Sequence, residues 1–82
     1  MLATTNTGET AYQRMVRGYA YAIYIYGTRS FSAVGETYHE DVERYAALKF
    51  APHEIENALA QGWITQLEYD QTVEKVGPYP TT

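Results

Sequence analysis

The stretch from Pro52 to Val76 constrains this fold more than any other, because its local chemistry dictates two short helices. Pro52 suits the first position of a helix, where its missing N–H group leaves no hydrogen bond unmade. Gly62 suits the left-handed residue that commonly follows a helix. Thr65 and Glu68 have the spacing of a capping box, in which each side chain bonds the other residue's backbone N–H. The stretch therefore predicts a helical pair joined at Gly62, with the second helix opening at Thr65.

Apolar residues around this helical pair indicate the faces that it buries. Ile64 and Tyr69 flank the cap at the spacing of a hydrophobic staple, which fixes the angle at which the chain enters the helix. Trp63 follows Gly62 at the position that folds back on the preceding turn. We therefore assign four side chains to the core: Leu59, Trp63, Ile64 and Tyr69.

The segment from Gly35 to Leu48 has the periodicity of a third helix. Its apolar side would hold Tyr38, Val42, Tyr45 and Ala46. Its acidic side would hold Glu36, Glu40 and Glu43. Glu40 and Arg44 are spaced as a favourable i,i+4 ion pair. We expect this helix to face the other two with its apolar side.

The tyrosine-rich segment from Tyr12 to Tyr26 fits two structures. A strand over residues 19–26 is favoured by the preference of Tyr and Ile for sheets, and by Gly18, which weakens a helix interior. Residues 11–17 would then form the second strand of a ribbon. The alternative is an all-α chain in which residues 7–26 are helical, because apolar residues also recur there at helical spacing.

These elements predict an α+β fold: a small Tyr-rich two-stranded β-ribbon packed on three short C-terminal helices. Residues 1–8 would be a disordered lead-in, because they are small and polar without apolar periodicity. Residues 9–77 would form a single small domain, and residues 78–82 a flexible tail.

Size and charge narrow the class of protein. A chain of 82 residues without cysteine has neither disulfides nor thiolate metal sites to stabilise it. The net charge of −4 is uneven, with +2 on residues 1–35 and −6 on residues 36–82. The N-terminal residues do not have the basic and apolar pattern of a leader peptide, so we expect none. The central uncharged run, residues 18–28, is too short to span a bilayer. We expect a cytoplasmic protein without membrane contact.

The sequence from Gly62 to Tyr69, GWITQLEY, matches the pattern G-x-I-T-x-x-E-Y. It resembles short phage proteins of the XkdX type, and the similarity continues loosely upstream from Leu59 to Val42. The chain departs from those proteins at Glu74–Gly77, where they usually close with Ile-Thr-Gly. The resemblance implies a phage or mobile-element accessory protein, located in the host cytoplasm, and carries no activity with it.

No residue pattern in the chain indicates catalysis. There is no cysteine nucleophile, no serine beside a histidine in a known turn motif and no glycine-rich phosphate loop. His39 and Glu43 share a helical face, but zinc sites use three or four protein ligands. We predict a protein that is not an enzyme and has no metal or cofactor.

Tyrosine and arginine, which are enriched at protein interfaces, gather in the first half of the chain. We predict a non-enzymatic protein–protein interaction module that binds a host or virion protein, or itself as a homodimer. The predicted partner-binding residues are Tyr21, Tyr24 and Tyr26 as surface anchors, with Arg17 and Arg29 at the rim.

Two alternatives use the same features. A small acidic protein could block a basic surface of a host protein, as anti-restriction and anti-CRISPR proteins do. The tyrosines and arginines could instead bind single-stranded nucleic acid weakly by stacking and charge. The acidity of the whole domain argues against nucleic acid as a partner.

Overall fold

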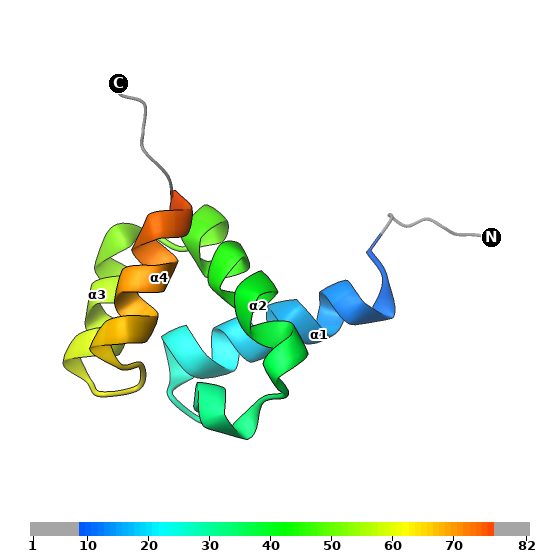
Figure 1. The fold of residues 1–82 in the computed structure, drawn as a ribbon, viewed down its shortest axis with the longest axis horizontal. Helices are drawn as coiled ribbons and strands as arrows, with labels where there is room; N and C mark the ends of the chain where they lie inside the picture. The colour runs from blue at the N-terminus through cyan, green and yellow to red at the C-terminus, as the bar shows by residue number, and fades with distance from the viewer. Residues whose placement is uncertain (1–8, 77–82) are drawn as a thin grey trace.

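The computed structural model describes residues 9–76, and in this range every regular element is helical. The α-helices are α1 (Ala11–Ala20), α2 (Glu36–Lys49), α3 (Pro52–Ala60) and α4 (Gln66–Val76). A π-helix, η1 (Tyr21–Tyr26), continues α1, and a 3₁₀ turn, η2 (Phe31–Ala33), precedes α2. In Figure 1, α1 and η1 cross α2, while α3 and α4 run antiparallel to each other. The predicted lead-in (1–8) and tail (78–82) lie outside the described residues.

The predicted β-ribbon is wrong, and the all-α alternative describes residues 11–26. The buried residues Val16, Ala20, Ile23 and Tyr24 recur at helical spacing. A strand would point the neighbours Ile23 and Tyr24 to opposite faces, yet both are buried. The helix also has its own start signal, because Thr10 and Gln13 form a capping box. Tertiary burial of one helical face thus overrides the sheet preference of Tyr and Ile.

The π-helix η1 ends at Gly27, which has a positive φ of 66°. Gly27 also touches another part of the fold: a Cβ atom built on it would overlap the indole ring of Trp63. Glycine is therefore needed at residue 27 both for its backbone conformation and for the close approach of Trp63.

The predictions for the helical pair are confirmed. Helix α3 begins at Pro52, and Gly62 has a φ of 80° in the connection to α4. Thr65 Oγ1 accepts a hydrogen bond from the Glu68 N–H at 3.1 Å, and Glu68 Oε1 accepts one from the Thr65 N–H at 2.8 Å. The local capping rules therefore place this boundary correctly without tertiary information.

The core lies where α1, η1, α2 and α3 meet, and α4 closes it on one side with the buried Thr72. Its largest fully buried hydrophobic side chains are Tyr24, Phe31, Ile23 and Val42. Ala20, Ala46 and Ala58 are completely buried, so their small side chains allow the helices to approach closely. Of the predicted core residues, Ile64 is buried, and Leu59, Trp63 and Tyr69 are half-buried against the core.

Candidate functional site

The structure places the predicted partner-binding residues in three different settings. Tyr24 is not a surface residue, because only 1% of it is exposed. Its hydroxyl lies 2.6 Å from Thr72 Oγ1, and Thr72 in turn donates to the Glu68 carbonyl oxygen at 2.8 Å. Tyr24 therefore donates to Thr72 and joins η1 to α4. The prediction of Tyr24 as a surface anchor assumed strand geometry, which would have turned it away from Ile23.

Tyr21 and Tyr26 lie together on the surface, with ring centroids 6.2 Å apart. They are 38% and 64% exposed, respectively. Residues five apart share a face in a π-helix, because its hydrogen bonds join residues five apart. Tyr21 also packs edge-on against Phe50, with centroids 5.0 Å apart. The π-helix thus pairs two of the predicted tyrosines that an ordinary α-helix would separate.

The two predicted rim arginines are separated. Arg17 binds both carboxylate oxygens of Glu9, at 2.9 and 3.0 Å. Hydrogen bonding to Glu9 raises the pKa of Arg17. The nearby Tyr45 and Tyr21 raise this pKa slightly further. Arg29 instead lies over the ring of Tyr19, 5.8 Å from its centroid. Arg17 therefore borders the paired tyrosines, whereas Arg29 belongs to a different part of the surface.

We define the aromatic seam as the exposed and half-exposed residues Tyr12, Tyr21, Tyr26, Tyr45 and Leu48. Tyr45 connects the set, because its ring lies 6.4 Å from Tyr21 and it lines a hollow of about 420 Å³ with Tyr12 and Leu48. Leu48 is 69% exposed. Sequence reasoning did not assign Leu48 or Tyr12 to a binding surface. Tyr12 comes from a different helix than Tyr45 and Leu48, and only the packing of the two helices brings the three together.

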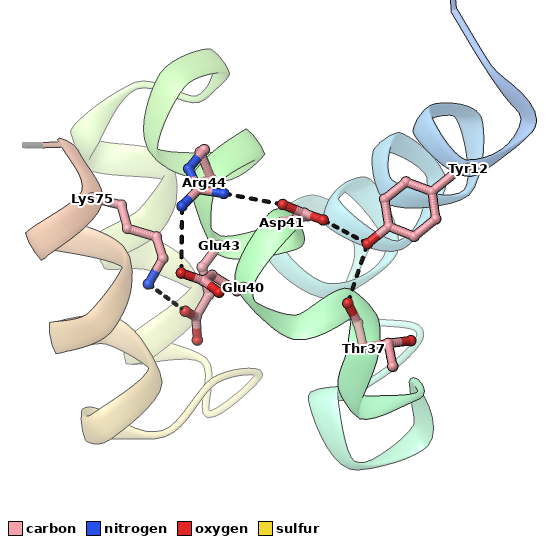
Figure 2. A network of polar contacts seen from close by, with 7 residues as sticks. All are labelled: Tyr12, Thr37, Glu40, Asp41, Glu43, Arg44 and Lys75. Atoms are coloured by element: carbon pink, nitrogen blue, oxygen red, sulfur yellow. Dashed lines mark hydrogen bonds and ion pairs between the residues drawn. The ribbon is translucent and has the colours of Figure 1, made fainter.

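A polar network borders one end of the seam (Figure 2). The Tyr12 hydroxyl lies 2.5 Å from Asp41 Oδ2 and 3.2 Å from the Thr37 carbonyl oxygen. The hydrogen bond to Asp41 raises the pKa of the Tyr12 hydroxyl. Arg44 Nη1 binds the other Asp41 oxygen at 3.0 Å, and its Nη2 lies 3.4 Å from Glu40, as the i,i+4 spacing predicted. The network fixes α1 against α2 beside the seam.

A second hollow, the acidic groove, lies between α2 and α4 and encloses about 550 Å³. Its acidic lining residues are Glu36, Glu40, Glu43 and Glu68. Leu67, which also lines it, is 65% exposed. The groove is acidic because α2 and α4, the two helices that carry most of the chain's negative charge, pack side by side.

The prediction that Glu43 lies on the exposed acidic side of its helix is wrong. Glu43 is 5% exposed, and its Oε1 accepts from Lys75 Nζ at 2.9 Å, joining α2 to α4 as Figure 2 shows. His39 Nε2–H donates to the Val34 carbonyl oxygen at 2.8 Å, and its ring packs edge-on against Phe31. His39 and Glu43 thus have separate partners. Within residues 9–76, no group of three or more histidine or acidic side chains is arranged to hold a metal ion.

Comparison with protein-family models, curated proteins and solved structures found no match. None of the helices in residues 9–76 has the length and apolar character needed to span a membrane. A functional hypothesis for this chain must therefore start from the surfaces described above.

Proposed function

We propose that the protein is a binding module of the blocking type, which covers a basic surface of another protein and carries out no reaction. The observation that carries the proposal is the acidic groove. Four glutamates and Lys75 line it. Because Lys75 pairs with the buried Glu43, the excess negative charge comes from the other three glutamates. The exposed Leu67 adds an apolar contact beside them. A surface of this composition is complementary to the arginine- and lysine-rich surfaces with which proteins hold nucleic acid.

The electrostatic part of the proposal follows from the distribution of charge. The C-terminal part of the chain, residues 36–82, carries a net charge of −6. Complementary charge speeds the encounter of two proteins and selects among partners more than it adds to affinity. Affinity would then depend on apolar anchors that are desolvated on binding.

The aromatic seam supplies such anchors. Tyr26 and Leu48 are 64% and 69% exposed, respectively, and tyrosine is among the residues most enriched in interface hot spots. The Arg17–Glu9 pair borders the seam, which gives the arrangement of an apolar centre with a charged rim. We therefore include Tyr21, Tyr26 and Arg17 in the proposed contact surface.

A blocking function suits this chain better than self-association. A homodimer would be favoured if this small chain needed a second copy to bury enough apolar surface. Residues 9–76 already enclose a core around Tyr24, Phe31 and Val42 without a second copy. The resemblance to XkdX-type phage proteins supports a phage or mobile-element origin. A blocking protein of that origin would act in the host cytoplasm as an anti-restriction or anti-CRISPR type inhibitor.

The experiment is affinity capture of host proteins, followed by measurement of binding to each purified captured protein. We expect a partner that binds nucleic acid, and we expect DNA to compete with this protein for it. The double variant Glu36→Gln/Glu40→Gln removes two charges from the groove and should weaken binding about tenfold, through slower association. Tyr26→Ser should weaken it by a similar factor through the seam.

The matched control is Glu56→Gln/Glu74→Gln, which removes the same charge from exposed positions outside the groove. It should change the dissociation constant less than twofold. Equal weakening by both double variants would contradict the role of the groove. Partners that bind with DNA still in place would contradict the blocking mechanism.

A further inference from the structure

A third hollow, of about 340 Å³, lies beside α1 and the turn after η1. It shares no lining residue with the acidic groove or with the hollow of the aromatic seam. Arg14 and Gly18 line it from α1, and Thr28 and Arg29 line it from the turn. None of the described residues that line it carries a carboxylate. In a chain with a net charge of −4, this hollow is locally basic.

The two arginines of the hollow have no ionic partner in the described part of the chain. The ion pairs of residues 9–76 use Arg17, Arg44 and Lys75. Arg14 and Arg29 form none of them. They are 15 positions apart in the sequence, yet both line this hollow. Both arginines are exposed residues, so neither charge is neutralised by a carboxylate of the described chain.

Arg29 is held in place before any ligand arrives. Its guanidinium lies 5.8 Å from the centroid of the Tyr19 ring, at a distance typical of a cation–π contact. Tyr19 is itself held edge-on by Tyr38, with centroids 5.1 Å apart. An arginine that is already positioned loses less conformational entropy when its N–H groups bind a ligand.

The surface between the arginines is open at Gly18. A Cβ atom built on Gly18 would have no heavy atom within 4 Å, so no other side chain covers this part of the helix. Glycine in a helix interior costs about 1 kcal/mol relative to alanine. Gly18 therefore leaves room for a ligand on the surface of the helix. Most other residues at this position would stabilise the helix more but would fill that space.

We propose that this hollow binds the phosphate group of a small molecule such as a mononucleotide. Two guanidinium groups match the charge of a phosphate monoester and the planar fork of each donates to pairs of its oxygens. Thr28 also lines the hollow, and its hydroxyl group can donate a third hydrogen bond. A single phosphate fits better than a nucleic-acid strand, because two cations on an acidic protein give too small a footprint for a polyanion. The proposal does not rest on the blocking function, which uses the groove and the seam.

The test is a calorimetric titration of the full chain with adenosine monophosphate in a phosphate-free buffer of low ionic strength. Arg14→Gln and Arg29→Gln should each weaken binding about tenfold or more, because each removes a charged hydrogen bond. Lys49→Gln is the matched control: it removes one exposed charge outside the hollow and should change the affinity less than twofold. Gly18→Leu should fill the open surface and weaken binding without unfolding the helix.

Inorganic phosphate and an oligothymidylate serve as the comparison ligands. Inorganic phosphate that binds through the same two arginines would support the assignment of the phosphate as the recognised group. An oligothymidylate that binds more tightly than adenosine monophosphate would overturn the choice of a small molecule. Absence of saturation at millimolar ligand, or equal weakening by Lys49→Gln, would overturn the site.

Discussion

Gly27 and Gly62 both have positive φ angles but stand in different surroundings. A Cβ on Gly27 would overlap the Trp63 indole ring, whereas a Cβ on Gly62 would meet no heavy atom within 4 Å. Gly62→Ala should therefore lower the free energy of unfolding by about 1 kcal/mol, through backbone strain alone. Gly27→Ala should lower it by about 3 kcal/mol or more, because the strain is joined by the displacement of Trp63. Urea unfolding of both variants measures the difference.

The double variant Gly27→Ala/Trp63→Ala separates the two contributions to the cost at residue 27. If the clash with the indole ring is the larger contribution, Gly27→Ala should cost clearly less in the Trp63→Ala background than in the wild type. An equal cost in both backgrounds would show that the Trp63 contact does not matter.

The Tyr24–Thr72 hydrogen bond has a defined direction, and this makes its two truncations unequal. Tyr24→Phe leaves Thr72 donating to Glu68 and should cost about 1 kcal/mol of stability. Thr72→Val leaves the Tyr24 hydroxyl buried without an acceptor and should cost about 2 kcal/mol. Denaturant unfolding measures both values. A smaller cost for Thr72→Val than for Tyr24→Phe would contradict the assigned donor.

At the scale of elements, two helices begin with the same capping box. Thr10 with Gln13 opens α1, and Thr65 with Glu68 opens α4. Thr10→Ala and Thr65→Ala should each lower the free energy of unfolding by about 1 kcal/mol, through the lost cap. Thr10→Asn and Thr65→Asn should retain most of the stability, because Asn also caps helices. Thermal unfolding of the four variants tests the prediction, and an unchanged Tm for both alanine variants would contradict it.

The Glu43–Lys75 pair joins α2 to α4 in a partly buried setting, with side chains 7% and 21% exposed. Lys75→Gln should lower the free energy of unfolding by about 2 kcal/mol, because it leaves a buried carboxylate without its cation. The control Arg44→Gln removes an exposed partner of Glu40 and Asp41 and should cost less than about 1 kcal/mol. Chemical unfolding near neutral pH compares them. A larger loss for Arg44→Gln would contradict the burial of Glu43.

At the scale of the whole molecule, we expect the folded protein to lose stability at alkaline pH, because three tyrosines have raised pKa values. Burial raises the pKa of Tyr24 and of Tyr45, and the hydrogen bond to Asp41 raises the pKa of Tyr12. In the unfolded chain each tyrosine loses its proton near pH 10, whereas the folded chain still holds it. The stability should thus be unaffected by these groups below about pH 10 and fall above it.

Urea unfolding at a series of pH values from about 8 to 11 measures this dependence, and the unfolded pKa near 10 sets the pH at which the fall begins. Tyr24→Phe should flatten the alkaline fall, because the most deeply buried of the three groups is gone. An alkaline slope that is identical in Tyr24→Phe and in the wild type would contradict the contribution of Tyr24.

The architecture and the candidate surfaces could be predicted from the sequence only in part. Helices α2, α3 and α4 follow from periodicity and caps, but the first half of the chain does not, because Tyr and Ile fit both a strand and a helix there. The predicted partner-binding set contained Tyr21, Tyr26 and Arg17, which the structure places on one surface, and Tyr24, which it buries. Leu48 and the acidic groove were missed because their neighbours are far away in the sequence.

The sequence by itself determined the boundaries of the helical pair, because caps, staples and the glycine between the helices act over a few residues. Only the tertiary structure decided that residues 11–26 are helical and that Tyr24 and Glu43 turn inward. It also decided which charged residues meet across helices, as Glu43 and Lys75 do. The physical reason is that burial and ion pairing depend on distances between segments remote in the chain, whereas capping depends only on neighbours.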